Sequence, residues 1–237
     1  MLDVRALLRV SDSCWGEVDL ATRRARLFPP PAPMHRGHDL YSMLTVAAAV
    51  LLGRQGCALI HAAAVVDPSG GACLLVGDSH SGKSTTTVNL ITRGWNYLSD
   101  DQVILVRSEG GLEVFGLLRP FHLDEGWSDG NPASRRGTVD ATSIGPGQPA
   151  RRAPLGRVLL PRVDAAQPTA IASASAAEVL ENIVRQSPWL LADPVGAPAI
   201  LDLLGEAART GGARLSLGLD TFSDAGRLER VLLSPGP

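Results

Sequence analysis

The chain has 237 residues, of which 45% are hydrophobic and 19% are charged. These are ordinary values for a folded globular protein, and they exclude a mainly disordered chain. The formal net charge is −2, so no overall basic field is present, and neither nucleic acid nor an anionic membrane is an expected partner. The length suits one generous domain, or one domain with a small appendage. A monomer and a homo-oligomer are both compatible with it.

No segment has the pattern of a membrane span or a signal peptide. The longest apolar stretch, residues 40–52, falls short of the roughly 20 residues that a spanning helix needs. The N-terminal MLDVRALLRV contains an aspartate and no cleavage-site pattern, unlike a secretory signal. The three cysteines are odd in number and lack metal-ligand spacing, so we expect small buried side chains in a reducing compartment. A soluble cytoplasmic protein is therefore predicted.

Two units are predicted along the chain. Residues 1–38 form a small β-rich appendage that ends in a proline-rich connector, and residues 39–237 form the main domain. Within the appendage, strand patterns occupy residues 4–10, 14–20 and 23–28. A run of strong helix formers predicts a helix over residues 40–53 at the start of the main domain.

Strands and helices then alternate through the main domain. Strands are predicted over residues 57–66, 72–76, 95–98, 102–107, 112–118, 157–163 and 214–219, and helices over 85–92, 176–185 and 197–209. Residues 124–155 are rich in Gly, Pro, Ser and Arg, which predicts a long mobile loop. The alternation favours an α/β fold on a mixed sheet.

A phosphate-binding motif lies between a predicted strand and a predicted helix. Residues 77–84, GDSHSGKS, match G-x-x-x-x-G-K-[ST] in the structural context that this motif requires. Its glycines let successive backbone N–H groups point at phosphate oxygens, while Lys83 is expected to reach the β- and γ-phosphates and Ser84 to bind Mg²⁺. The predicted nucleotide-binding residues are Gly77, Asp78, Ser79, His80, Ser81, Gly82, Lys83, Ser84 and Thr85.

The motif also contains the only lysine of the chain. The other 21 of the 22 basic residues are arginines. The preference for arginine over lysine that holds at every other basic position therefore does not hold at position 83. Arginine is bulky and forked, whereas lysine is a compact point charge on a flexible stem. We therefore expect Lys83 to lie in a cramped site.

An acidic pair follows the motif. Asp100 and Asp101 lie 17 and 18 residues after Lys83, behind one helix and one short strand. In a β-α-β unit with parallel strands, the second strand ends beside the phosphate loop. One carboxylate is expected to help hold Mg²⁺, and the other to accept a proton from an incoming hydroxyl.

These residues together resemble a known family. The span from position 61 to 105 is similar to the catalytic core of HPr kinase/phosphorylase, and closer still to the HPr-kinase-like proteins of lasso-peptide gene clusters, which phosphorylate a serine of the precursor peptide. It covers roughly a fifth of the chain. The matching elements, in order, are His61, Gly77-Asp78-Ser79, Arg93-Gly94 and Asp100-Asp101.

The resemblance implies roles for individual residues. Asp101 matches the proton acceptor of the family, and His61 a residue near the γ-phosphate. Glu113, in a Leu-Glu-Val-Phe-Gly run, resembles a Mg²⁺-binding glutamate but lies closer to the acidic pair than the family spacing. The candidate catalytic residues are thus Asp101, Lys83, His61 and Asp100, and the candidate metal ligands Ser84, Asp101 and Glu113.

The resemblance implies an HPr-kinase-like P-loop core that uses ATP and Mg²⁺ to phosphorylate a Ser or Thr hydroxyl of a peptide or small protein, with a lasso-peptide precursor as the expected acceptor. The long C-terminal signature of the HPr enzymes is not recognisable, so HPr is not the expected substrate. A small-molecule kinase and a non-catalytic nucleotide-binding module are the alternatives. Further candidates for contact with phosphate or substrate are Arg119, Arg135, Arg136, Arg151 and Arg152, for which a solvated surface position is the competing interpretation.

Overall fold

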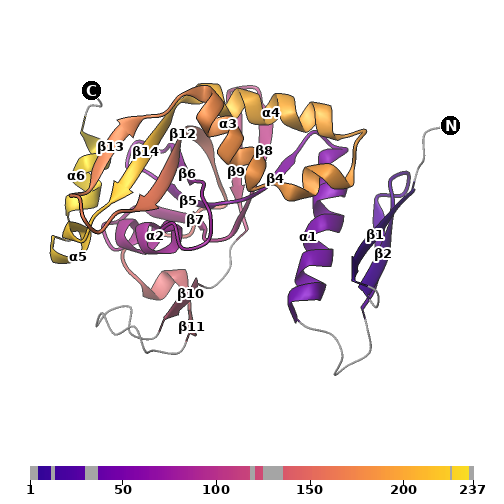
Figure 1. The fold of residues 1–237 in the computed structure, drawn as a ribbon, viewed down its shortest axis with the longest axis horizontal. Helices are drawn as coiled ribbons and strands as arrows, with labels where there is room; N and C mark the ends of the chain where they lie inside the picture. The colour runs from indigo at the N-terminus through magenta and orange to yellow at the C-terminus, as the bar shows by residue number, and fades with distance from the viewer. Residues whose placement is uncertain are drawn as a thin grey trace.

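The computed structural model describes residues 5–11, 14–29, 37–117, 121–124, 136–224 and 226–234. They form a mixed α/β fold in which a curled sheet of nine strands has helices on both faces (Figure 1). A separate three-stranded sheet packs against one long helix near the N-terminus. In the described part of the chain, no helix combines the length and the apolar character needed to cross a membrane.

The main sheet has the order β4-β8-β9-β12-β6-β5-β7, with β14 paired to β12 and β13 paired to β14. Its strands are β4 (Ala58–His61), β5 (Ala63–Val66), β6 (Ala72–Leu75), β7 (Asn96–Ser99), β8 (Gln102–Ser108), β9 (Gly111–Gly116), β12 (Arg152–Val163), β13 (Ala170–Ser173) and β14 (Gly212–Leu217). The β6–β12 and β12–β14 pairs are parallel, and the other pairs are antiparallel. The predicted mixed sheet is therefore confirmed.

The central strand β6 is apolar throughout because both of its faces are covered. Leu74 joins the cluster that includes α3 (Ala176–Arg185) and α4 (Ala197–Thr210). Cys73 and Leu75 join the opposite cluster, to which α2 (Lys83–Ile91) and α6 (Arg227–Leu233) contribute. Alternate side chains thus bury themselves on opposite faces, which fixes the register of β6 and the position of the loop that follows it.

The N-terminal strands form as predicted. They are β1 (Arg5–Ser11), β2 (Cys14–Asp19) and β3 (Arg24–Phe28), arranged as an antiparallel sheet. Leu8 and Val18 of this sheet pack against Ala47 and Val50 of α1 (Gly37–Gly53). Helix α1 therefore lies between the small sheet and the main one (Figure 1).

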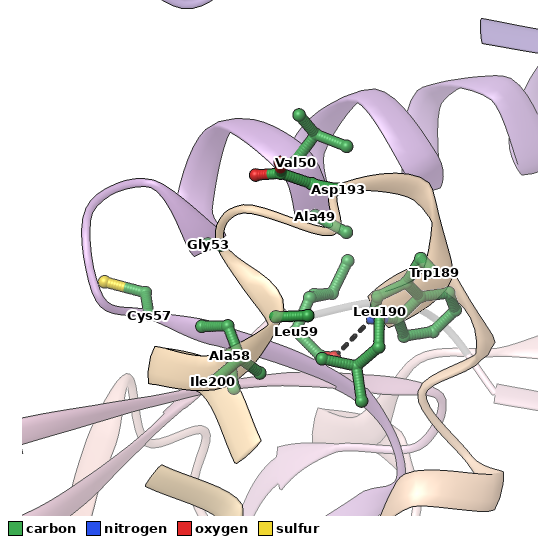
Figure 2. Close-up of a pocket in the computed structure, with 12 residues that line it drawn as sticks. Ala49, Val50, Gly53, Cys57, Ala58, Leu59, Trp189, Leu190, Asp193 and Ile200 are labelled. Atoms are coloured by element: carbon green, nitrogen blue, oxygen red, sulfur yellow. Dashed lines mark hydrogen bonds between the residues drawn. The ribbon is translucent and has the colours of Figure 1, made fainter. Parts of the chain in front are cut away.

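Helix α1 is held against the main sheet by a tightly packed junction (Figure 2). Here Trp189 Nε1, on the 3₁₀ helix η2 (Pro188–Ala192), donates to the carbonyl oxygen of Leu59 at 2.6 Å. Arg54, just past the end of α1, donates from its terminal nitrogen to Asp193 Oδ1 at 2.7 Å. The cavity between these elements has a volume of only about 20 Å³, close to the space that one water needs. The junction therefore fixes α1 rather than binding a ligand.

Two parts of the fold differ from the sequence prediction. The apolar run 57–66 forms two strands, because the chain changes partners at Ala62: β4 pairs with β8, and β5 pairs with β6 and β7. The long loop predicted over 124–155 is wrong in its second half. Strand β10 (Phe121–Asp124) pairs with β11 (Arg136–Val139), a 3₁₀ turn η1 (Ala141–Ser143) follows, and β12 already begins at Arg152.

The segment between η1 and β12 is irregular but anchored. Tyr97 N donates to the carbonyl oxygen of Gln148 at 2.9 Å, and Ala150 N donates to that of Tyr97 at 2.7 Å. The low periodicity of this segment predicted a mobile loop. In the structure, backbone groups of the segment form hydrogen bonds with strand β7 instead. No local sequence pattern encodes pairing between residues about 50 positions apart in the chain.

Candidate functional site

The loop of residues 77–84 connects β6 to α2 and has the tight curl that its sequence predicts. Ser81 N donates to the carbonyl oxygen of Asp78 at 3.2 Å, and Thr86 N to that of Gly82 at 2.9 Å. His80 and Gly82 have positive φ values of 63° and 99°, a conformation that turns neighbouring N–H groups toward one side of the loop. The helix that follows adds the partial positive charge of its N-terminus.

Both motif glycines are required by space. A Cβ atom at Gly82 would lie 2.5 Å from Leu217 Cδ1, and one at Gly77 would lie 2.8 Å from Ser81 Oγ. The loop is thus pressed against the end of β14 and against itself. The rim is open by contrast, since Asp78, Ser79 and His80 are exposed.

Lys83 is buried at the start of α2. Its Nζ donates to the carbonyl oxygens of Gly77 and Asp78, at 2.7 and 2.9 Å. Burial lowers the pKa of the ammonium, and the negative charges of Asp100 and Asp101 oppose that shift. A narrow site with two closely spaced carbonyl acceptors suits a compact ammonium better than a planar guanidinium.

Asp100 lies against the other end of the motif. Ser84 Oγ donates to Asp100 Oδ2 at 3.1 Å. The second oxygen, Oδ1, is buried, and no group in the described part of the chain donates a hydrogen bond to it. Burial raises the pKa of Asp100 to about 7; the hydrogen bond from Ser84 opposes this shift and the charge of Asp101 adds to it. Such a carboxylate is a good position for a cation, which would neutralise a charge that burial disfavours.

Asp101, its neighbour in sequence, has different partners. His61 Nδ1, at the end of β4, lies 3.0 Å from Asp101 Oδ1. The hydroxyl of Tyr41, on α1, donates to Asp101 Oδ2. The side chain of Asp101 remains 33% exposed. It is therefore held in one orientation while an external group can still reach it.

The topology explains how the acidic pair meets the loop. Strand β5 lies between β6 and β7 and is antiparallel to both, so β6 and β7 run in the same direction. Their carboxyl ends meet at the same edge of the sheet, where ligands of α/β proteins commonly bind. The Ser84–Asp100 hydrogen bond is the direct contact between the two ends.

The sequence did not indicate two residues that complete this arrangement. Tyr41 stands in a predominantly apolar helix; its only signal is that Thr45, four residues on, is also polar, so that both lie on one helix face. Thr45 Oγ1 accepts a hydrogen bond from Gln102 Nε2 at 3.1 Å, which fixes that face against β8. Gln186, at the end of α3, carries no sequence signal. It donates from Nε2 to Asp78 Oδ1 at 2.8 Å, and its carbonyl accepts from His61 N at 3.0 Å.

The structure does not bring Glu113 to the other candidates. Glu113 pairs across the sheet with Val106, four residues beyond Gln102 on β8, a separation of about 13 Å along the strand. Its carboxylate lies 3.6 Å from Arg152 NH1. The hairpin turn at 108–111 is the reason, because it places Glu113 near the far end of the β8–β9 pair. By contrast, Ser84, another of the predicted metal ligands, does lie at the acidic pair, since its hydroxyl donates to Asp100.

The predicted arginines divide into two groups. Arg152 lies over the ring of Phe115, with 5.8 Å from its guanidinium carbon to the ring centre, and beside Glu113; Arg151 is exposed. Arg119 and Arg135, as well as the side chain of Arg136, lie outside the described residues. Of the predicted substrate-contacting arginines, Arg151 and Arg152 are thus the two whose side chains the structure describes. They lie at the start of β12, and Arg152 contacts Phe115 and Glu113 of β9.

Comparison with known proteins gives limited information. No protein-family model matches the chain, and no curated protein matches it significantly in sequence. A solved structure that it resembles is the Hpr(Ser) kinase/phosphatase from Coxiella burnetii, with 13% sequence identity and a TM-score of 0.38 over 68% of this chain and 79% of that chain. A likeness this distant does not define a function, so the geometry of the 77–84 loop and the two carboxylates carries the functional assignment.

Proposed function

We propose that this protein is a phosphotransferase that uses ATP and Mg²⁺ to phosphorylate a Ser or Thr hydroxyl of a peptide or small protein. The observation that carries the proposal is the difference between Asp100 and Asp101. Asp100 has one carboxylate oxygen that is buried and another that accepts a hydrogen bond from Ser84 of the phosphate-loop motif, whereas the carboxylate of Asp101 is partly exposed and is held by His61 and Tyr41. Two adjacent carboxylates with such different environments suit two different tasks.

The 77–84 loop and Asp100 would form the donor side of the site. Backbone N–H groups of the loop and the N-terminus of α2 suit phosphate oxygens, and Lys83 adds a positive charge among them. Ser84 and Asp100 offer the hard oxygen ligands that Mg²⁺ prefers, and the buried, unpartnered Oδ1 of Asp100 fits a cation. When bound, Mg²⁺ would neutralise charge that develops on the phosphates. We therefore propose Asp100, rather than Asp101 or Glu113, as the metal ligand beside Ser84.

Asp101 would form the acceptor side. A carboxylate that is 33% exposed can reach the hydroxyl of an incoming substrate and take its proton as the oxygen attacks, the role of a general base. His61 and Tyr41 would keep the carboxylate in the orientation that this proton transfer needs. Gln186 would support the same geometry, since it connects the backbone of His61 to the rim of the loop.

The class of acceptor rests on the sequence resemblance. The elements His61, residues 77–79, Arg93-Gly94 and the pair Asp100-Asp101 resemble the catalytic core of HPr kinase/phosphorylase, and the span that holds them resembles the HPr-kinase-like proteins of lasso-peptide clusters more closely still. We therefore propose a serine or threonine of a lasso-peptide precursor, a ribosomally made peptide, as the acceptor.

The test is a transfer assay with radiolabelled ATP and Mg²⁺. The acceptors are a peptide with the sequence of a lasso-peptide precursor, the same peptide with its Ser and Thr residues replaced by Ala, and free serine. We expect label on the first peptide alone, and expect Asp101→Asn to abolish labelling while Glu109→Gln, an exposed acid in the β8–β9 turn, leaves it intact. Better labelling of a free small molecule would favour the small-molecule kinase. Nucleotide binding without transfer to any acceptor would favour the regulatory module.

A further inference from the structure

A second cavity, separate from the acidic pair, opens beside the 77–84 loop. Its volume is about 290 Å³, and its wall includes Gly82 of the motif, Thr85 directly after the motif, Val163 at the end of β12 and Leu217 at the end of β14. The short helix α5 (Asp220–Ser223) contributes Phe222 to the wall. The lining is mainly apolar. Val163 and Leu217 in it are the last residues of the parallel strands β12 and β14, which lie side by side in the sheet (Figure 1).

Five polar side chains interrupt this apolar wall, and two of them, Thr86 and Asn89, each have a buried atom without a partner in the described part of the chain. Thr86 is fully buried, and neither its hydroxyl nor the buried side-chain oxygen Oδ1 of Asn89 has a hydrogen-bond partner within the described residues. Both side chains line the cavity. A buried polar atom without a partner costs free energy, so a ligand that offered hydrogen-bonding groups to these two atoms would offset that cost.

We propose that this cavity binds the adenine base of the phosphate donor. This inference rests on the proposed function, because it takes the phosphates to lie in the 77–84 loop. Gly82 belongs both to the motif and to the cavity wall, and Thr85, the residue directly after the motif, lines the cavity too, so a nucleotide with its phosphates in the loop has its nucleoside end at the cavity. The acidic pair lies on the other flank, after β7, which leaves that side to the acceptor.

Size and chemistry both fit the base. An apolar cavity of about 150 Å³ holds benzene, so a cavity of about 290 Å³ accommodates a two-ring base with part of a sugar. Phe222, which is 69% exposed, offers a ring against which a base can stack. An asparagine side chain pairs with adenine by accepting from its exocyclic amino group and donating to a ring nitrogen. Guanine presents an oxygen in place of that amino group, so Asn89 would distinguish the two bases.

Calorimetry on the full-length protein tests this assignment with two probes, ATP and inorganic tripolyphosphate. We expect Phe222→Ala to weaken ATP binding about 5- to 150-fold, the range found for base stacking, while tripolyphosphate binds as before. Asn89→Leu should weaken ATP roughly 10-fold and reduce the preference of the wild type for ATP over GTP. Leu233→Ala removes an exposed apolar side chain of α6 that does not line the cavity, and it should change neither affinity.

The controls separate failure of this inference from failure of the proposed function. Lys83→Ala should weaken ATP and tripolyphosphate alike, since its charge acts on phosphates. If it does so while Phe222→Ala and Asn89→Leu bind ATP like the wild type, the base lies elsewhere and the cavity assignment is overturned. If Lys83→Ala binds both probes normally, the phosphate site and the proposed function fail together. Melting temperatures close to that of the wild type show that each variant is folded.

Discussion

The two flanks of the 77–84 loop are built on different principles. On the acidic flank, β4, β7 and α1 bring His61, the acidic pair and Tyr41 into contacts that are short and directional. On the apolar flank, β12, β14 and α5 line a cavity with Val163, Leu217 and Phe222. One flank fixes charged groups in set orientations, and the other offers apolar area to a ligand.

Because of this difference, variants on the two flanks should change different quantities: the rate of the chemical step on the acidic flank, and the affinity for the ligand on the apolar flank. Hydrogen-bonded carboxylates act on a proton or a metal ion, so their loss should lower the rate of the chemical step. An apolar cavity contributes mainly through burial, which is not directional, so its loss should weaken binding. The predictions below test that separation on the acidic flank and in the loop that both flanks share, from the largest expected effect to the smallest.

The largest effect is expected for Asp101→Asn. As the proposed proton acceptor, Asp101 acts in the transition state, and loss of a general base lowers the rate about 10²–10⁴-fold. ATP affinity should stay within a few fold, because Ser84 and Asp100 remain. Single-turnover transfer and calorimetry measure the two quantities, with Glu109→Gln as the matched control. Abolished ATP–Mg²⁺ binding would instead make Asp101 a metal ligand, with Asp100 next in line as the base.

A large effect is also expected for Lys83→Arg. The ammonium is buried between two loop carbonyls, and a planar guanidinium does not fit that space. Transfer should fall about 10²–10³-fold, the loss typical when one electrostatic contact to the reacting group is removed, and nearly as far as in Lys83→Ala. The exposed Arg209→Lys on α4 is the reverse control and should be silent. Near wild-type transfer by Lys83→Arg would refute the steric explanation of the lone lysine.

A moderate effect is expected for Tyr41→Phe. This change removes one hydrogen bond to a charged carboxylate, so kcat should fall about 10-fold while the KM for ATP is unchanged, and the pH profile of kcat should shift because Asp101 loses a donor. Thr45→Val, one turn along α1, breaks the bond to Gln102 and serves as the control for a merely structural defect. If both variants lower kcat equally and neither moves the pH profile, Tyr41 acts through helix packing alone.

The smallest effect concerns stability, in Asp100→Asn measured without metal. The pKa of Asp100 rises from 3.8 to about 7 on folding, so the folded state holds more protons than the unfolded state between these values. Wild-type stability should therefore decrease as the pH rises from about 4 to 7, by up to a few kcal/mol, and the asparagine variant should lack this decrease. The difference in Tm, mutant minus wild type, should grow over that range at about 2–4 °C per kcal/mol. A difference that is constant with pH would show that Asp100 is not desolvated.

The sequence predicted local structure well where the hydrophobic periodicity agreed with the turn and capping residues that begin and end an element. A helix was predicted at residues 176–185, the observed bounds of α3, and the structure shows Ser175 as its N-cap, accepting from Glu178 N. The three N-terminal strands and the β8–β9 hairpin were also predicted within a few residues. By contrast, the prediction missed the change of strand partners at Ala62 and the start of β12 at Arg152. The local pattern of apolar and polar residues does not specify which strand a segment pairs with.

The site divides in the same way. By itself the sequence determined the phosphate-loop motif and its lone lysine, because backbone curl, helix start and charge are encoded in consecutive residues. It also placed the acidic pair near the loop through the βαβ order, although β5 lies between the two strands. Only the tertiary structure decided which carboxylate meets Ser84, that Tyr41 from α1 and Gln186 from α3 join the site, and that Glu113 stays apart with Arg152. Those contacts join residues up to 108 positions apart in the chain; they are set by sheet register and helix docking, which no local pattern encodes.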